Sequence, residues 1–155
     1  TFGPRQSARA IIPTIITQLL QKKKIIKLGN LSPTRDFTYV EDTVEAFYKA
    51  MKIKNASCEI INIGNKFEIS IKDIVNILKK DFHYKFDIEI DKKRIRAKNS
   101  EVYRLFASNS KAMKILKWSP KYSGQKGFKK GLAKTIKWFV ESKNLKYYKS
   151  DIYNI

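Results

Sequence analysis

The sequence contains few of the residues that usually carry catalysis, metal binding or covalent cross-linking. Cys58 is the only cysteine and His83 the only histidine among 155 residues. A single cysteine excludes a disulfide within the chain and a zinc site built on cysteines, and it fits a reducing compartment. His83 stands between Phe82 and Tyr84 without an obvious carboxylate partner, as is typical of a surface or packing residue. We therefore predict no metal site and a cytoplasmic location.

Several sequence motifs of catalytic and cofactor sites are also missing. The chain has no GxGxxG or P-loop glycine pattern, no HExxH and no GxSxG. A catalytic site complete in itself is therefore not expected, and the Glu41-Asp42 pair is better explained by helix capping. No apolar run approaches the roughly 20 residues of a membrane helix, and we expect no membrane partner. The chain begins with Thr1 and shows no signal-peptide pattern, so we expect it to be part of a longer protein.

Acidic residues are also in the minority: 14 Asp and Glu face 33 Lys and Arg, which gives a net charge of +19. Such an excess of positive charge first suggests nucleic-acid binding. A basic nucleic-acid-binding module remains the alternative function from another class. The lysines are spread over the whole length without a tail. Where they bunch, they fall at the ends or outer faces of predicted helices (Lys22–Lys24, Lys79–Lys80, Lys129–Lys130). We therefore interpret them mainly as solvent-facing residues and do not expect nucleic acid as the partner.

Hydrophobic periodicity predicts about five helices interleaved with short strands. The expected helices are residues 11–24, 42–53, 69–82, 108–118 and 127–143. Alternating or β-branched segments predict strands at 25–30, 35–40, 59–65 and 85–91, with a further short strand in the arginine-rich stretch 94–107. The fold class is therefore α/β, a mixed α+β lobe. We expect residues 1–155 to form a single unit, with 141–155 as a loosely ordered tail.

Two of the expected helices carry start signals. Ser70 with Asp73 at the third position predicts a cap for the helix at 69–82. In the helix at 42–53, Asp42 is the expected cap and Glu45 completes a capping box. An apolar stripe on that helix is expected to face the core; it consists of Val44, Phe47, Tyr48 and Met51.

The arginines are the clearest candidates for binding an anion. The chain has six: Arg5, Arg9, Arg35, Arg94, Arg96 and Arg104. A diphosphate needs two or more guanidiniums that converge from different segments, because the planar fork of Arg binds phosphate oxygens in pairs. The alternative is pairing with a neighbouring carboxylate, Asp36 or Glu41 for Arg35 and Glu101 for Arg96. Spacing alone leaves both interpretations open.

Four segments resemble, in order and spacing, the C-terminal part of extended short-chain dehydrogenase/reductases that act on nucleotide sugars. They read GPRQSARAIIPTIITQ, IKLGNLSPTRDFTYVEDTVEAF, EIINIGNKFEISIKDI and RIRAKNSEVYRLFASNSKAMKILKWSPKYSGQKGFKKGLAKTIKWF. The resemblance covers the chain to about Phe139. It is closest to the NDP-sugar 4,6-dehydratase and epimerase branch, and within it to the GDP-sugar dehydratases of nonulosonic (legionaminic) acid synthesis.

The resemblance implies the C-terminal substrate-binding portion of an extended Rossmann-type enzyme. In such enzymes the N-terminal half carries the glycine fingerprint for NAD or NADP and the catalytic Tyr-x-x-x-Lys, and neither is found here in that context. The implied partners are a nucleotide-diphosphate sugar and this N-terminal Rossmann half. The implied lobe is inactive by itself and does not bind the cofactor strongly. A nucleotide-sugar sensor without chemistry is a third interpretation.

The resemblance also implies a set of substrate-binding residues: Arg35, Arg96, Ala10, Ile11, Ile12, Asn62 and Arg9. Arg35, in the RDF motif, is expected to bind the diphosphate, and Arg96 is expected to reach the phosphates or the ribose.

The remaining implied roles concern the nucleobase, the ribose and the cofactor. The backbone of residues 10–12 is expected to surround the nucleobase, and Asn62 to lie on the ribose side. Arg5 is expected near the nicotinamide end of the cofactor or near the sugar. Ala97 stands where the family usually has proline. Asp36 is expected to hold a neighbouring loop.

Overall fold

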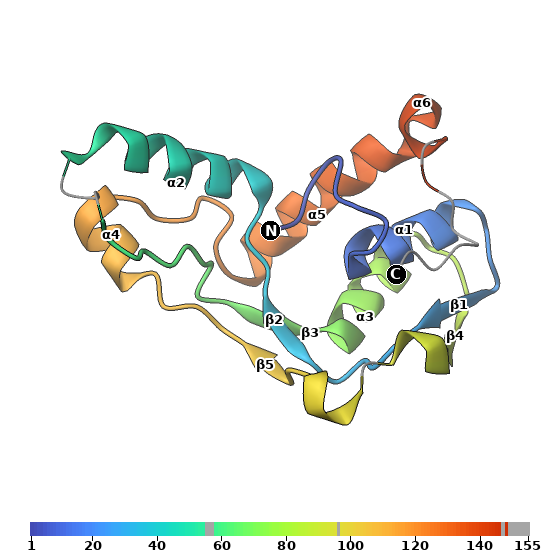
Figure 1. Ribbon diagram of the computed structural model, residues 1–155. Coiled ribbons are helices and arrows are strands. Elements are labelled where there is room, and N and C mark those ends of the chain that lie inside the picture. The colour runs from blue at the N-terminus through green and yellow to red at the C-terminus, as the bar shows by residue number, and fades with distance from the viewer. Residues whose placement is uncertain (55–57, 96, 147, 149–155) are drawn as a thin grey trace. The chain divides into compact units, whose positions relative to one another are not determined.

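The computed structural model describes residues 1–54, 58–95, 97–146 and 148 (Figure 1). The chain divides into two compact units. The first unit comprises Thr1–Pro4, Arg35–Glu68 and Leu105–Thr135, and the second comprises Arg5–Thr34, Ile69–Arg104 and Ile136–Ile155. Each unit is described by itself, and the expectation that residues 1–155 form one lobe stays a prediction.

Helices and short strands interleave along the chain, so the predicted α/β class is confirmed. The helices are α1 Ile11–Leu20, α2 Val40–Lys52, α3 Ile71–Asp81, α4 Ser110–Leu116, α5 Gly124–Val140 and α6 Ser142–Leu145. The strands are β1 Ile25–Leu28, β2 Thr34–Asp36, β3 Glu68–Ser70, β4 Asp87–Ile90 and β5 Arg104–Leu105. β1 pairs with β4, and β2 lies between β3 and β5 in a second sheet. In the part of the chain that the structure describes, no helix is both long and apolar enough to cross a membrane.

In the second unit, α1 packs on a two-stranded parallel sheet. The apolar spacing that predicts this helix also buries it, at Ile12, Ile15, Ile16 and Leu19. The register of the sheet places Ile26 opposite Ile88. Gln18 ties the helix to β1, because its amide group accepts the backbone N–H of Lys27 at 2.9 Å and donates to the Lys27 carbonyl at 3.2 Å.

The predicted cap of α3 is confirmed. The Ser70 hydroxyl accepts the backbone N–H of Asp73 at 3.0 Å, and it donates to the Asp73 carboxylate at 2.6 Å. Behind this cap the helix buries its apolar stripe, which includes Ile74, Ile77 and Leu78.

An aromatic cluster forms the core of the first unit. The ring of Tyr39 lies 5.4 Å from that of Phe2 and 4.4 Å from that of Tyr122, measured between centroids. Phe128 of α5 joins the cluster at 5.2 Å from Phe2. Gly131, one turn further along α5, faces these rings so closely that an added Cβ would lie 2.9 Å from the Tyr39 ring. The chain start, the segment between β2 and α2, and α5 are therefore held together around Tyr39.

The expected capping role of Asp42 is wrong. α2 begins at Val40, its N-cap is Tyr39, and no side chain caps it. The Asp42 carboxylate instead accepts the backbone N–H groups of Lys121, at 2.8 Å, and Tyr122, at 3.0 Å. Asp42 is 1% exposed, and these two loop donors need an acceptor where water has little access. These two hydrogen bonds, and not the local capping pattern, determine where the Asp42 carboxylate lies.

The expected direction of the apolar stripe on α2 is also wrong. Val44, Phe47, Tyr48 and Met51 are exposed, whereas Ala46, on another face of the helix, is 1% exposed and packs in a cluster with Leu116 and Trp118. The core of the first unit therefore uses the small-residue face of α2.

Two expected strands differ from the structure. The strand expected at 35–40 ends at Asp36, after which Phe37, Thr38 and Tyr39 continue as buried irregular chain. The strand expected at 59–65 does not form, because it pairs with no strand among the described residues. Of the tail, α6 is helical, and residues 147 and 149–155 lie outside the described part.

Candidate functional site

The residues implied for substrate and cofactor binding are distributed over both units. Arg35 and Asn62 belong to the first unit, and residues 9–12 and Arg5 belong to the second. Arg96 lies outside the described residues.

Arg35 occupies the middle of β2 and is half-buried. Both carboxylates that sequence reasoning considered as its partners are engaged by other groups. Asp36 accepts backbone N–H groups, and Glu41 accepts a hydrogen bond from the Tyr122 hydroxyl at 2.7 Å and one from the Lys134 ammonium at 2.9 Å.

Asp36 holds the loop that follows the expected strand at 59–65. Its carboxylate accepts the backbone N–H groups of Asn65 at 2.7 Å, Lys66 at 3.1 Å and Ala107 at 3.4 Å. Burial raises the pKa of this carboxyl group, and the three backbone donors oppose that shift. The expectation that Asp36 holds a neighbouring loop is confirmed.

Gly64 is required for this close packing of loop and strand. A Cβ added at Gly64 would lie 2.5 Å from the Ala107 Cβ and 3.0 Å from the Asp36 carboxylate. The next residue, Asn65, is 1% exposed and donates from its side-chain amide to the carbonyls of Phe37 and Tyr122, at 3.3 and 3.1 Å. The side chains of Asp36 and Asn65 thus fix the position of the loop relative to the strand of Arg35 through hydrogen bonds to backbone groups.

Asn62, expected on the ribose side, lies just before this loop and is exposed. Two other asparagine oxygens, Oδ1 of Asn65 and Oδ1 of Asn109, are buried and accept no hydrogen bond from the described residues. The Asn109 amide donates to the Gly64 carbonyl at 2.8 Å. The polar groups of this region therefore gather around Gly64 and Asn65, which sequence reasoning did not select.

The second part of the candidate site is the N-terminus of α1. Ala10 is its N-cap, no side chain caps it, and its first turn holds no acidic residue. The first-turn amides of Ile11 and Ile12 have no helical carbonyl to donate to, as at every helix start. Ile12 is fully buried in the core, and the expected role of its backbone stays a prediction.

The other arginines differ in their surroundings. Arg5 and Arg9 are exposed, and Arg5 has a left-handed backbone with φ of 64°. The Arg94 Nε donates to the Asp91 carboxylate at 3.2 Å, three residues earlier in the chain. This pairing gives Arg94 a structural role, and the D-x-x-R spacing could have predicted it.

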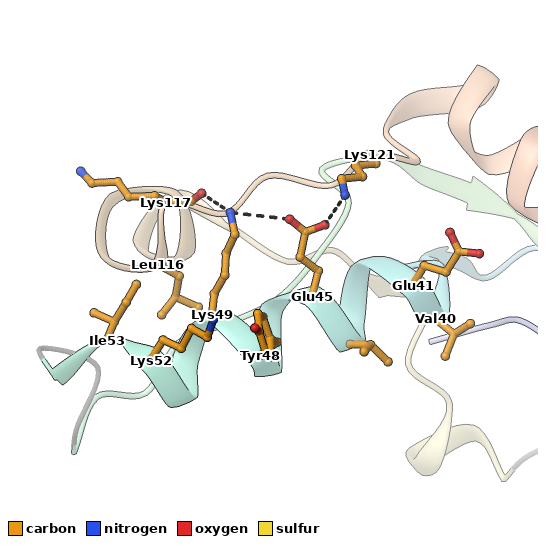
Figure 2. Close-up of a pocket in the computed structure, with 11 residues that line it drawn as sticks. Val40, Glu41, Glu45, Tyr48, Lys49, Lys52, Ile53, Leu116, Lys117 and Lys121 are labelled. Atoms are coloured by element: carbon orange, nitrogen blue, oxygen red, sulfur yellow. Dashed lines mark hydrogen bonds and ion pairs between the residues drawn. The ribbon is translucent and has the colours of Figure 1, made fainter.

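Sequence reasoning did not predict a cavity of about 920 Å³ beside α2 and α4 in the first unit. Figure 2 shows the Glu45 carboxylate between two lysines, 3.6 Å from the Lys49 ammonium and 2.8 Å from that of Lys121. Tyr48 and Lys52 of this wall have the Tyr-x-x-x-Lys spacing. The Lys52 ammonium, however, lies over the Tyr48 ring, 4.1 Å from its centroid. That placement is a cation–π contact on an exposed helix face.

The chain is similar in sequence to a family of sugar dehydratases and to individual dehydratases and epimerases. The sequence model of the family described as GDP-mannose 4,6 dehydratase matches residues 1–131. Human dTDP-D-glucose 4,6-dehydratase is 32% identical over 146 residues, which cover 91% of this chain and 39% of the relative. UDP-glucuronate 4-epimerase of Thermodesulfobacterium geofontis is 30% identical over 142 residues, or 91% of this chain and 41% of the relative.

The structural similarity extends over the same part of the relatives. UDP-glucuronic acid 4-epimerase of Bacillus cereus, solved with UDP-glucuronic acid and NAD, matches with a TM-score of 0.77 and 30% identity, over 88% of this chain and 41% of that one. dTDP-glucose 4,6-dehydratase of Bacillus anthracis, solved with NAD, matches with a TM-score of 0.78 and 26% identity, over 92% and 42%. The chain thus spans about two fifths of the length of these relatives. The resemblance to nucleotide-sugar dehydratases and epimerases is confirmed, and the narrower one to the nonulosonic acid enzymes stays a prediction.

Proposed function

Because the chain belongs to the GDP-mannose 4,6-dehydratase family, whose model it matches over residues 1–131, we propose that it is the nucleotide-diphosphate-sugar binding lobe of an NAD- or NADP-dependent sugar 4,6-dehydratase or epimerase. The larger remainder of the relatives' length corresponds, in this proposal, to an N-terminal Rossmann half. That half binds the cofactor and carries the catalytic tyrosine and lysine. By itself the lobe binds substrate and does not turn it over.

The observation that supports this proposal is the environment of Arg35. The guanidinium projects from a strand whose next residue, Asp36, is anchored by three backbone N–H groups. The neighbouring acid Glu41 is engaged by Lys134 and Tyr122. The hydrogen bonds of Asp36 fix the backbone of the strand that carries Arg35. A rigidly placed guanidinium suits a diphosphate, which carries about two negative charges and accepts paired, charge-assisted hydrogen bonds.

The other proposed contacts follow the resemblance. Arg96 provides the second guanidinium, Arg9 lies close to the nucleotide, and Asn62 faces the ribose. The backbone at Ala10, Ile11 and Ile12 surrounds the nucleobase. The N-terminus of α1 carries no acidic residue, so its partial positive charge remains available to an anionic ligand. Arg5 lies toward the cofactor.

The chemistry of the proposed enzyme is divided between the two halves. The cofactor would be held by the Rossmann half and would supply hydride-transfer chemistry at C4 of the sugar. The residues of this chain hold the diphosphate and so determine where the sugar lies. Binding energy from the contacts with the diphosphate positions the reacting carbon. No residue of this chain takes part in bond breaking.

The alternative, a basic nucleic-acid-binding module, finds limited support. Phe37 and Tyr39 are 8% and 2% exposed, so they cannot stack on bases. Phe47 and Tyr48 are exposed, against the expectation that they face the core. Duplex DNA is therefore the appropriate control ligand.

The test is calorimetric titration of the chain with UDP-glucose, dTDP-glucose and GDP-mannose at physiological salt. We expect one nucleotide to bind selectively, and Arg35→Ala to weaken it by about 1.5–3 kcal/mol, roughly tenfold to a hundredfold. Arg104→Ala, which removes an exposed arginine of β5, is the matched control and should bind as wild type.

Equal affinity in wild type and Arg35→Ala would contradict the phosphate role. Binding of duplex DNA alone, falling steeply with salt, would favour the basic module. Binding of neither nucleotide nor DNA would contradict the proposal that the lobe binds substrate by itself.

A further inference from the structure

Tyr148 connects the end of the described chain with its beginning. Its hydroxyl donates to the backbone carbonyl of Gln6 at 3.0 Å, across 142 residues of sequence, and both residues belong to the second unit. Gln6 lies in the loop 5–9, which carries Arg5 and Arg9 and leads into the N-terminus of α1. The contact therefore reaches the second part of the candidate site.

The side chain and the backbone of Tyr148 are both held in place. Its ring packs edge-on against Phe139, with centroids 4.8 Å apart, and against Trp138 at 6.1 Å. Phe139 is fully buried, and edge-to-face pairs of aromatic rings are favourable. The Tyr148 N–H donates to the Leu145 carbonyl at 2.9 Å, and the side-chain amide of Asn144 donates to the Trp138 carbonyl at 2.8 Å. The hydroxyl is thus presented to the loop 5–9 from a fixed position.

The loop 5–9 contains a backbone conformation that needs support. Arg5 has φ of 64°, a left-handed value that is unfavourable for residues other than glycine and persists where surrounding contacts maintain it. Further along the loop, the Thr14 hydroxyl of α1 donates to the Ala8 carbonyl at 3.0 Å. Gln6 lies between these two points. The bond from Tyr148 therefore supports the part of the loop next to the left-handed residue.

The Tyr148 hydroxyl remains a hydrogen-bond donor at neutral pH. Burial raises the pKa of this phenol above its ordinary value of 10.0, and the positive charge of Arg5 opposes the rise. A phenol donates its proton to a carbonyl only while it is protonated. The influence of Arg5 on this pKa also indicates that its guanidinium lies within electrostatic reach of Tyr148.

We propose that Tyr148 is a positioning residue for the binding of a nucleotide diphosphate: by holding the Gln6 carbonyl it determines the path of the loop 5–9 and the points from which Arg5 and Arg9 reach the ligand. Tyr148 itself does not touch the ligand. A loop that is already ordered costs less free energy to bind with than one that must be ordered by the ligand. This inference rests on the proposed function, since Arg5 and Arg9 have ligand roles only there.

The test uses two variants that each remove one tyrosine hydroxyl and keep the ring. Tyr148→Phe removes the bond to the loop 5–9. Tyr84→Phe is the matched control, because the Tyr84 hydroxyl donates to the Lys22 carbonyl at 2.8 Å, in the same unit but away from this loop. Each variant loses one hydrogen bond from a phenol to a backbone carbonyl, so a general loss of stability should be similar in the two.

The first measurement is the rate of cleavage by an arginine-specific protease, with the products identified by mass spectrometry. Cleavage in a folded chain follows the population of locally open states. We expect cleavage after Arg5 and Arg9 to be roughly threefold to tenfold faster in Tyr148→Phe than in wild type, the effect of one hydrogen bond. Cleavage after Arg104 is the internal reference and should not change, and Tyr84→Phe should be cleaved like wild type at all three residues.

The second measurement is calorimetric titration with UDP-glucose, dTDP-glucose and GDP-mannose. We expect Tyr148→Phe to bind the selected nucleotide roughly threefold to tenfold more weakly than wild type, and Tyr84→Phe to bind it with unchanged affinity. If Tyr148 had only a structural role, the two variants would have the same affinity.

Unchanged cleavage after Arg5 and Arg9 in Tyr148→Phe overturns the inference. Faster cleavage with the affinity of wild type also overturns it, and leaves Tyr148 as a residue that stabilises the fold. If wild type binds no nucleotide, the proposed function fails, while the cleavage rates, which need no ligand, still decide whether Tyr148 holds the loop.

Discussion

The carboxylate of Asp36 accepts the backbone N–H of Asn65, 29 residues later in the sequence, at 2.7 Å. This contact connects the strand that carries Arg35 with the loop at Gly64. Since the Asn65 side chain in turn donates to the carbonyls of Phe37 and Tyr122, the strand, the loop and the segment just before α5 form one hydrogen-bonded assembly. Arg35, the residue proposed to bind the phosphates, is therefore positioned by contacts that do not involve its own side chain.

Asp36→Asn should destabilise the fold and weaken nucleotide binding together. An amide at this position can offer only one acceptor oxygen, so at least one of the three backbone N–H groups faces a donor. We expect a loss of about 1–3 kcal/mol in the free energy of unfolding, measured with urea. Asp87→Asn, at an exposed position of β4, is the control and should change stability by less than about 0.5 kcal/mol. If Asp36→Asn is as stable as wild type and binds nucleotide with unchanged affinity, the three hydrogen bonds accepted by Asp36 are not needed to position Arg35.

Asp42→Ala should be among the more destabilising substitutions in the first unit. It leaves the backbone N–H groups of Lys121 and Tyr122 without their acceptor at a site where Asp42 is 1% exposed. We expect the free energy of unfolding, measured with urea, to fall by about 2–4 kcal/mol. The control is Asp73→Ala in the first turn of α3, where the loss should be about 0.3–1 kcal/mol. Equal losses for the two variants would contradict the role assigned to Asp42.

Glu41 gives the first unit a defined pH dependence. Hydrogen bonds from Lys134 and Tyr122 lower the pKa of this carboxyl group from its ordinary value of 4.5. A lowered pKa in the folded state means that the stabilisation is present above the ordinary value and is lost as the pH falls through the folded-state pKa. The thermal midpoint of wild type should therefore exceed that of Glu41→Gln near neutral pH, and the difference should shrink as the pH falls below about 4.5. A difference that stays constant with pH would be inconsistent with this coupling.

The sequence predicted those elements whose packing partners lie within the chain. The spacing of Ile12, Ile15 and Ile16 predicted α1, and the Ser70–Asp73 pattern predicted the cap of α3, because in both cases the deciding contacts are local or fall in the same unit. The capping prediction for Asp42 is wrong because the backbone partner of its carboxylate, Tyr122, lies 80 residues away. A capping rule that examines one helical turn cannot detect that partner.

The errors at α2 and at 59–65 have a common cause. Periodicity identifies an apolar face but not what covers it, and β-branched composition identifies a strand but not the strand beside it. The exposure of Phe47 and Ile60 shows that no described part of the chain supplies either cover.

The candidate site was predictable only in part. The resemblance identified Arg35, and the local D-x-x-R pattern could have identified the Arg94–Asp91 pair. The engagement of Asp36 and Glu41 by other segments requires the folded structure.

The most direct test of the central claim follows the guanidinium of Arg35 itself. The chain is labelled with ¹⁵N-arginine, and its Nε–H signals are recorded by NMR while UDP-glucose, dTDP-glucose and GDP-mannose are added in turn. We predict that the Arg35 signal shifts and saturates with the nucleotide that binds, and that the signal of Arg94, held by Asp91, stays in place. An Arg35 signal that does not move while nucleotide binds elsewhere on the chain would contradict the account.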